Sequence, residues 1–119
     1  MFKALLLISF LLPAVAWAQG DALRGKVVAV VRCGPCHHLK SNYLKVGPGL
    51  KGVYGKAPTI QGVPFDLWDD ASLNAWLINP RKIKPNTRML LPYMTERDRK
   101  DIIAWLKHDA LRLPSVDSR

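Results

Sequence analysis

Cys33-Gly34-Pro35-Cys36-His37 is the stretch of this chain that decides its fold. Two thiols three residues apart can each form a thioether with one vinyl group of a haem, and the adjoining imidazole then lies beneath the iron. The pattern C-x-x-C-H is therefore typical of c-type haem attachment. Because Cys-Gly-Pro-Cys is also the active-site tetrapeptide of thioredoxins, the pentapeptide alone leaves two interpretations open, a haem carrier and a dithiol redox enzyme.

The segment before the cysteines, residues 21–32, is compatible with both interpretations. Lys26 to Val31 is rich in β-branched residues, which would suit the buried strand that precedes a thioredoxin active site. Asp21 can instead cap the start of a helix. Four aliphatic residues also recur at the i, i+4, i+7, i+8 spacing of one helix face: Leu23, Val27, Val30 and Val31. We favour the helix.

The sequence after the cysteines predicts mostly loops at first. We expect a short helical turn over residues 36–40 and irregular chain over residues 57–64. Residues 47–55 hold four glycines and a proline, which predicts a loop. Residues 81–92 are basic and punctuated by prolines, and they predict a second long loop.

Two further helices are expected in the C-terminal half. Asp69-Asp70 places acid at the start of the first, which Asn79-Pro80 ends. Thr95 caps the last helix, which has an apolar face and runs to about His108. No run of alternating or continuous β-branched residues follows the cysteines, although a thioredoxin fold needs several strands there. The sequence therefore predicts an all-α fold.

Residues 1–18 have the pattern of a cleaved signal peptide. Lys3 gives a basic start, residues 4–12 form an apolar run, and Ala16-Trp17-Ala18 supplies the small-x-small motif that signal peptidase requires. The run is shorter than the about 17–25 residues that span a bilayer, and an uncleaved amphipathic anchor is the alternative. We expect export to the periplasm, which would leave residues 19–119 as one domain without an integral membrane segment.

The chain is strongly basic. Its formal net charge is +9, from 18 Lys and Arg against 9 Asp and Glu, and removal of Lys3 would leave +8. Such a charge is compatible with nucleic-acid binding, but export and the lack of a basic-aromatic pattern argue against nucleic acid as a partner. A cationic surface on a small exported protein instead favours an acidic protein partner or an anionic membrane face.

A haem iron needs an axial ligand on each side, and the motif fixes His37 as one of them. Four residues are candidates for the other: Met89, Met94, His38 and His108. A methionine thioether favours Fe(II) and raises the reduction potential, which suits an electron carrier. We favour Met89, because it lies in a polar, proline-containing loop that can reach over a haem face. We expect Met94 to be a packing residue and both histidines to be solvated.

The chain from residue 19 onward resembles a class I c-type cytochrome over nearly its whole length. Besides the haem motif, five segments match that family in order and spacing: Gly20-Asp21-x-x-x-Gly25, Gly47-Pro48-x-Leu50-x-Gly52-x-x-Gly55, Trp68-x-x-x-x-Leu73 to Asn79-Pro80, Pro85-Asn86-Thr87-Arg88-Met89 and Asp101-Ile-Ile-Ala-Trp105-Leu106. The resemblance implies a cytochrome c fold, in which a few short helices wrap around one covalently attached haem c. The first and last helices would cross, with Gly25 allowing their close approach.

The resemblance also implies the roles of individual residues. The cofactor-binding residues would be Cys33, Cys36, His37, Met89, Pro48 and Trp68, with His37 and Met89 on the iron. The Pro48 carbonyl would orient His37 by accepting a hydrogen bond, and Trp68 would contact a haem propionate. Two departures stand out. Ala29 replaces the usual aromatic residue, and the segment from Gly55 to Trp68 is short, as in many small bacterial mono-haem members.

The resemblance implies one-electron transfer, with iron cycling between Fe(III) and Fe(II), rather than enzymatic activity. Eight basic residues, here called the basic ring, flank the loops expected to frame the haem: Lys40, Lys45, Lys51, Lys56, Arg81, Lys82, Lys84 and Arg88. We expect a monomer whose basic ring docks transiently on an acidic oxidase, reductase or dehydrogenase. Three alternatives remain: a haem subunit permanently bound in a larger oxidoreductase, a gas sensor or peroxidase with an open sixth site, and a thioredoxin-like dithiol oxidoreductase.

Overall fold

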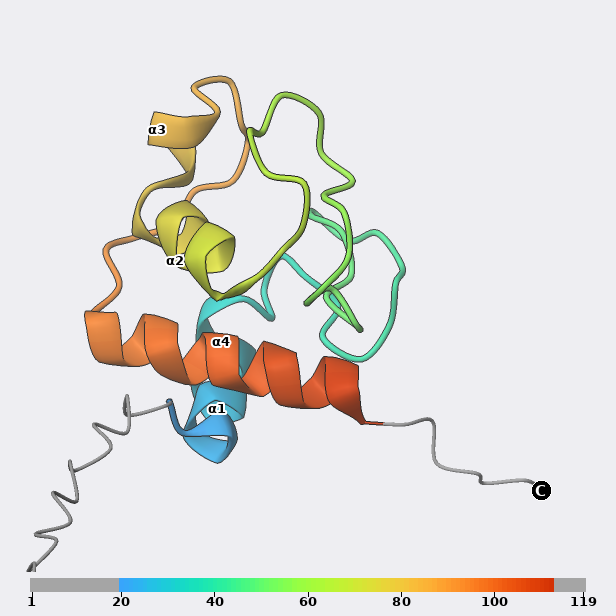
Figure 1. Ribbon diagram of the computed structural model, residues 1–119, viewed down its shortest axis with the longest axis vertical. Helices are drawn as coiled ribbons and strands as arrows, with labels where there is room; N and C mark the ends of the chain where they lie inside the picture. The colour runs from blue at the N-terminus through green and yellow to red at the C-terminus, as the bar shows by residue number, and fades with distance from the viewer. Residues whose placement is uncertain (1–19, 113–119) are drawn as a thin grey trace, which may run out of the picture.

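The computed structural model describes residues 20–112 and contains four helices (Figure 1). They are α1 (Ala22–Arg32), α2 (Asp70–Ile78), α3 (Pro80–Ile83) and α4 (Glu96–Leu111). No strand occurs within residues 20–112, so the all-α prediction is confirmed and the strand considered for Lys26 to Val31 is wrong. The signal peptide expected over residues 1–18 lies outside the described residues.

Side chains cap three of the helices where the sequence predicts. The Asp21 carboxylate accepts a hydrogen bond from the Arg24 N–H at 3.1 Å, and the Thr95 hydroxyl accepts one from the Asp98 N–H at 3.1 Å. At α2, Asp69 and Ser72 form a reciprocal capping box. These bonds satisfy backbone donors that a helix start otherwise leaves without a partner. Helix α4 begins as expected but continues to Leu111, one turn beyond His108.

Helix α1 crosses α4 at very close range (Figure 1). A Cβ atom on Gly25 would overlap the carbonyl oxygen of Asp101, and one on Gly20 would overlap that of Lys100. Only glycine lets two backbones approach this closely. The expectation that Gly25 permits the crossing of the first and last helices is confirmed.

Charged residues hold the two helices together at this crossing. Asp101 is 4% exposed, and its carboxylate accepts the Asp21 N–H at 2.8 Å and the Arg24 guanidinium at 2.5 Å. The same guanidinium binds Asp98 at 2.7 Å. Ala29 is fully buried in the contact. Position 29 therefore holds a small residue within the α1–α4 contact, which the hydrogen bonds of Asp101 also join.

The aliphatic stripe of α1 faces outward. Its four members are 55–81% exposed: Leu23, Val27, Val30 and Val31. An apolar stripe at this spacing is normally the face that a helix buries. Here the buried face is instead set by Gly25 and Ala29, whose small size allows the close approach to α4. Periodicity predicted the helix correctly and indicated the wrong face.

Two local expectations are wrong. The tight turn after α1 covers residues 33–36, not residues 36–40, because the Cys36 and His37 N–H groups both bond back to the Cys33 carbonyl. Residues 80–83 form the single turn α3 rather than loop. Asn79 ends α2 and also caps α3 by accepting the Lys82 N–H at 3.2 Å, and proline suits the first position of a helix.

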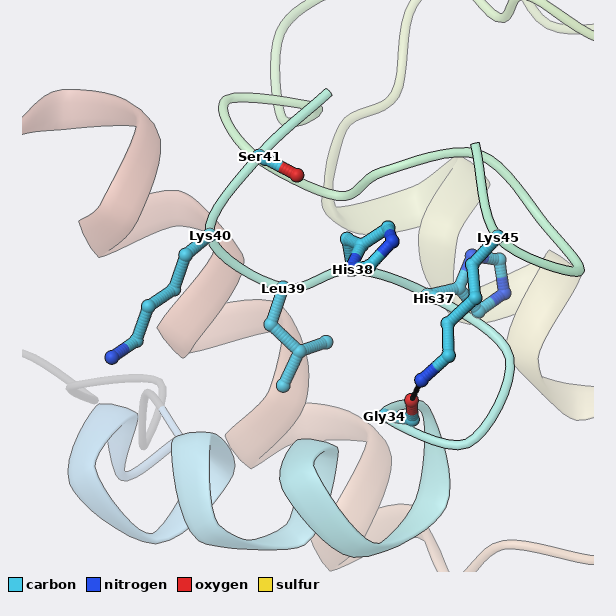
Figure 2. A pocket seen from close by; sticks show the side chains of 7 residues that line it. All are labelled: Gly34, His37, His38, Leu39, Lys40, Ser41 and Lys45. Atoms are coloured by element: carbon cyan, nitrogen blue, oxygen red, sulfur yellow. Dashed lines mark hydrogen bonds between the residues drawn. The ribbon is translucent and has the colours of Figure 1, made fainter. Parts of the chain in front are cut away.

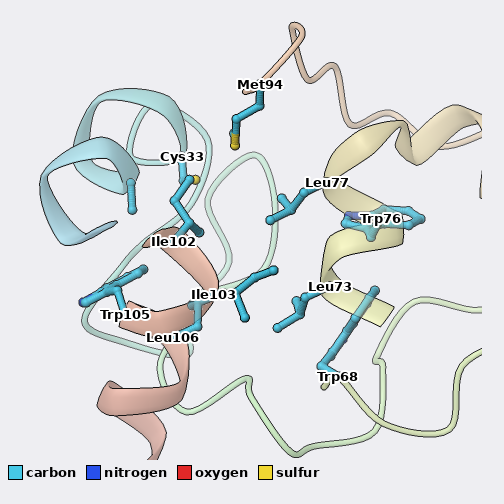
Figure 3. Close-up of a cluster of buried hydrophobic side chains, with 11 residues drawn as sticks. Cys33, Trp68, Leu73, Trp76, Leu77, Met94, Ile102, Ile103, Trp105 and Leu106 are labelled. Atoms are coloured by element: carbon cyan, nitrogen blue, oxygen red, sulfur yellow. The ribbon is translucent and has the colours of Figure 1, made fainter. Parts of the chain in front are cut away.

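The hydrophobic core lies between α2, α4 and the turn after α1 (Figure 3). In Figure 3, Leu73 and Leu77 of α2 point toward Ile103 of α4, and Cys33 extends into the same cluster. The remaining expected loops, over residues 47–55 and 57–64, contain no helix or strand. Within the described part of the chain, no helix combines the length and apolarity needed to cross a membrane.

Candidate functional site

The turn at the end of α1 positions both cysteines. The Gly34 N–H bonds to the Ala29 carbonyl at 3.0 Å, and the His37 N–H bonds to the Cys33 carbonyl at 2.9 Å. Cys33 is buried, Cys36 is exposed, and both thiols are free. The two sulfurs therefore belong to one rigid turn, with His37 as its next residue.

The Cys33 thiol is poorly suited to dithiol chemistry. Burial raises its pKa to about 11, although the nearby Arg32 charge acts in the opposite direction. A thioredoxin-like enzyme attacks with a thiolate, and its nucleophilic cysteine has a lowered pKa. Since residues 20–112 also contain no strand, the structure argues against the thioredoxin-like alternative.

His37 is oriented by the loop that follows it. Its Nδ1 lies 2.7 Å from the Pro48 carbonyl oxygen, which is the contact that the family resemblance implies. Because a carbonyl can only accept, Nδ1 carries the proton, and the lone pair of Nε2 remains available for a metal. Two backbone bonds hold this loop against the cysteine turn, from the Gly47 N–H to the Cys36 carbonyl at 2.7 Å and from the Leu50 N–H to the His38 carbonyl at 2.8 Å.

Gly47 packs directly against the imidazole. A Cβ atom at this position would overlap Cε1 of the His37 ring and crowd its Nδ1. The glycine therefore provides the space in which the ring reaches the Pro48 carbonyl. This dependence was not identified from the sequence, where Gly47 counted only as one glycine of a loop.

A pocket of about 330 Å³ lies beside His37 and opens to solvent (Figure 2). Its lining residues are Gly34, His37, His38, Leu39, Lys40, Ser41 and Lys45. Lys45 closes one side by donating a hydrogen bond from its ammonium group to the Gly34 carbonyl at 2.9 Å (Figure 2). Met89 and Trp68 do not line this pocket, so it covers only the histidine side of the candidate site.

Met89 and Trp68 belong to a second group of residues, which Trp76 joins. The Trp76 indole donates a hydrogen bond from Nε1 to the Met89 sulfur at 3.2 Å. Trp76 also meets Trp68 edge-on, with ring centroids 5.8 Å apart. The sequence does not predict this link, because α2 is apolar on several sides and no pattern marks the direction in which Trp76 points.

The alternative ligands have the environments that the sequence predicts. Met94 is 1% exposed and packs within the core (Figure 3). His38 and His108 are exposed at the surface. Met89 is partly buried in the loop between α3 and α4. These placements favour Met89 over the other three candidates.

The donor set fits a covalently attached haem. Two free thiols with C-x-x-C spacing, an imidazole with a free Nε2 and a thioether with a second lone pair are the groups that such a haem requires. No side-chain hydrogen bond within residues 20–112 joins the His37–Pro48 pair to the Met89–Trp76 pair. The two pairs are thus separate hydrogen-bonded groups in the described part of the chain.

No protein-family model matches the chain. It is similar to curated proteins named cytochrome c from several eukaryotes. The protein from Euglena viridis is 39% identical over 98 residues, which cover 74% of this chain and 96% of that protein. Those from Gibberella zeae and Arabidopsis thaliana are 34% and 33% identical, and the matches cover 76% of this chain and 95% and 91% of those proteins.

Proposed function

Because this chain belongs to the cytochrome c family, we propose that it is an exported one-electron carrier with His37 and Met89 as axial ligands. Members of the family carry one covalently attached haem c and transfer electrons rather than catalyse a reaction. The observation that carries the assignment of the site is the His37 Nδ1–Pro48 contact beside two free thiols, because it leaves Nε2 available at a haem-attachment motif.

Each site residue has a defined task in this proposal. Cys33 and Cys36 form the two thioethers, and the rigid turn between them fixes the position of the His37 ring. Pro48 holds the proton of Nδ1, so that Nε2 binds as a neutral ligand. The bound haem supplies an iron that gains and loses one electron. If the His37 imidazole and the Met89 thioether both held the iron, no coordination position would remain for a substrate, and the chain would need to bind only its redox partners.

The ligand assignment is tested by absorption spectroscopy of the purified protein. We expect a haem c spectrum and, in the ferric protein, the charge-transfer band of a sulfur–iron bond. This band should vanish in Met89→Leu, because leucine keeps the size of methionine and has no donor atom. Met94→Leu is the matched control and should retain the band. A colourless protein with two titratable thiols would contradict the haem assignment, and loss of the band in Met94→Leu alone would contradict the choice of Met89.

The proposed location is the periplasm of a bacterium, and the support for it is the sequence pattern of residues 1–18. Mass spectrometry of the periplasmic fraction should find a chain that begins at Gln19 and carries one haem. A chain that begins at Met1 in a membrane fraction would instead indicate the uncleaved anchor.

The proposed partners are acidic redox proteins that meet the basic ring. Seven of its eight members are exposed and Lys84 is partly buried, and within residues 20–112 none of them forms an ion pair. Charge steering of this kind raises association rates and weakens with salt.

Stopped-flow reduction by an acidic flavodoxin tests this surface. At low ionic strength Lys82→Glu should slow association several-fold, whereas Arg112→Glu, which changes the net charge equally outside the basic ring, should slow it far less. Equal rates for the two variants would remove the basic ring as the docking surface.

The second candidate is a haem subunit held permanently in a larger oxidoreductase. The outward aliphatic stripe of α1 favours it, because four exposed branched side chains on one helix are typical of a surface that a partner covers. Size-exclusion chromatography of the protein from its native host at high salt separates the two candidates. A shuttle would elute at the mass of a monomer, and a subunit would elute with its complex.

A further inference from the structure

We infer that Lys84 is a haem-binding residue whose ammonium group is the counter-ion of a haem propionate and raises the reduction potential. This role requires the covalently bound haem of the proposed function. The family resemblance assigns only Trp68 to a propionate, and Lys84 has so far counted as one of eight docking residues in the basic ring. The structure separates it from the other seven.

Lys84 is the member of the basic ring that is partly buried, whereas the other seven are exposed. Within residues 20–112 it forms no ion pair with a carboxylate. Removing an ammonium group from water costs free energy, and charged groups that lose water normally gain a partner of opposite charge. An anion that is not part of the described chain would balance this charge.

The side chain of Lys84 reaches the loop that ends at Trp68. Its Nζ lies 3.6 Å from the point that a Cβ atom on Gly62 would occupy, and Gly62 has a φ of +83°. Two backbone hydrogen bonds close the base of this loop, from the Trp68 N–H to the Lys56 carbonyl at 2.9 Å and from the Gly55 N–H to the Trp68 carbonyl at 2.6 Å. The ammonium group therefore lies against the loop whose last residue is expected to contact a propionate.

The backbone of Lys84 belongs to the segment that carries Met89. The Lys84 carbonyl accepts the Thr87 N–H at 2.9 Å, and the Thr87 hydroxyl accepts the Met89 N–H at 3.2 Å. The Lys84 N–H bonds to the Pro80 carbonyl at 2.9 Å and ends α3. Lys84 thus joins the segment of the proposed axial ligand to the loop that precedes Trp68.

The chemistry of the haem favours a propionate as the missing anion. Vinyl and propionate groups lie on opposite halves of the porphyrin, so a haem attached at Cys33 and Cys36 directs its carboxylates away from the cysteine turn. Figure 1 shows the segment after α3 and the loop before Trp68 at the end of the molecule opposite α1. Asp66 is the one acidic residue among residues 57–67, and within the described chain it forms no ion pair with Lys84.

The effect on the iron follows from charge. The ferric site carries one positive charge more than the ferrous site, so a nearby carboxylate stabilises Fe(III) and a nearby ammonium group destabilises it. Lys84 compensates the charge of the propionate and so favours Fe(II). Removal of the ammonium group should therefore lower the reduction potential.

The experiment is potentiometry of the haem-loaded wild type, Lys84→Gln and Lys82→Gln at neutral pH. Lys82 is exposed on α3, and its replacement removes the same charge. We expect the equilibrium constant for reduction to fall about threefold to tenfold in Lys84→Gln, which is about 28–59 mV for a one-electron couple. Solvent and salt screen the charge of Lys82, so Lys82→Gln should change the constant by less than about twofold.

Resonance Raman spectra provide a readout of the contact itself. The bending mode of the haem propionates should shift in Lys84→Gln and keep its wild-type frequency in Lys82→Gln. Lys84→Arg keeps the positive charge, and it should keep the wild-type potential within about twofold.

The two measurements together decide the inference. A lowered potential with a shifted propionate mode, both restored in Lys84→Arg, would support it. An unchanged propionate mode in Lys84→Gln, or an equal fall in potential in Lys82→Gln, would overturn the inference while leaving the proposed function intact. A wild type that lacks a haem c spectrum would overturn both.

Discussion

Gly47 and Pro48 both position the imidazole of His37, but in different ways. Pro48 contributes its carbonyl oxygen, which every residue has, whereas Gly47 contributes the absence of a side chain. The site should therefore tolerate substitution of Gly47 less well than substitution of Pro48.

We predict that Gly47→Ala impairs the site and that Pro48→Ala does so far less. The alanine methyl at position 47 would displace the His37 ring from the Pro48 carbonyl, whereas Pro48→Ala keeps the accepting oxygen. The haem content of the purified variants and the pH at which His37 dissociates from iron measure the effect. Loss of haem in Pro48→Ala with a normal Gly47→Ala would contradict this prediction.

The sequence predicts one half of the site better than the other. Cys33, Cys36 and His37 form one continuous motif whose chemistry follows from its spacing, and the Pro48 contact lies in the next loop. Trp76 and Met89 are 13 residues apart in different elements. Their contact depends on how α2 is rotated about its axis, which tertiary packing decides and local sequence does not encode.

At the level of elements, the α1–α4 crossing depends on backbone contact. We predict that Gly25→Ala lowers the free energy of unfolding by about 1–3 kcal/mol, because its methyl overlaps Asp101 and forces the helices apart. Val27→Ala on the exposed side of α1 is the control and should change it by less than about 0.5 kcal/mol. Chemical denaturation of the haem-loaded variants gives both values, and a larger loss in Val27→Ala would show that the stripe is buried.

The hydrogen bonds that Asp101 accepts from Asp21 and Arg24 predict that the stability of the fold falls in acid. Burial alone would raise the pKa of Asp101, but hydrogen bonds from the Asp21 N–H and the Arg24 guanidinium outweigh it and lower the pKa below its ordinary value. A carboxyl with a lowered pKa stabilises the fold above its unfolded-state pKa of about 3.9, and this contribution is lost as the pH falls through the folded-state value. We predict that Asp101→Asn costs about 1.5–3 kcal/mol at pH 7.

The pH dependence provides the check on that prediction. Denaturation midpoints of wild type and Asp101→Asn should differ at pH 7 and converge as the pH falls below 4. A difference that stays constant down to pH 2 would show that the carboxylate charge does not contribute.

The helices themselves are well predicted from sequence, because caps and stop signals are local. Asp21, Asp69 and Thr95 each begin a helix as expected. The buried face of α1 was not predictable, since hydrophobic periodicity assumes that large residues face the core, and here two small ones do. The single turn of α3 was missed because one residue, Asn79, both ends α2 and caps the next turn.

For the whole molecule, the stability of the domain should depend on its cofactor. Among residues 20–112, Met94 and Ile102 are the largest side chains with less than 2% exposure, whereas twelve large apolar residues are exposed. We predict that the double variant Cys33→Ala/Cys36→Ala is colourless, melts well below the haem-loaded wild type and unfolds with lower cooperativity. Circular dichroism during heating measures both properties. An equally stable colourless variant would show that the protein chain alone forms a sufficient core.

The exposed aliphatic stripe of α1 offers a partner protein an apolar contact in addition to the electrostatic attraction of the basic ring. The attraction exerted by the basic ring declines as ions are added, whereas burial of Leu23, Val27 and Val31 would not be screened. Burial of these apolar side chains by a partner would give binding a negative heat-capacity change. Contact through α1 would therefore tighten on warming from the cold, and isothermal titration at several temperatures would distinguish it from a purely ionic encounter.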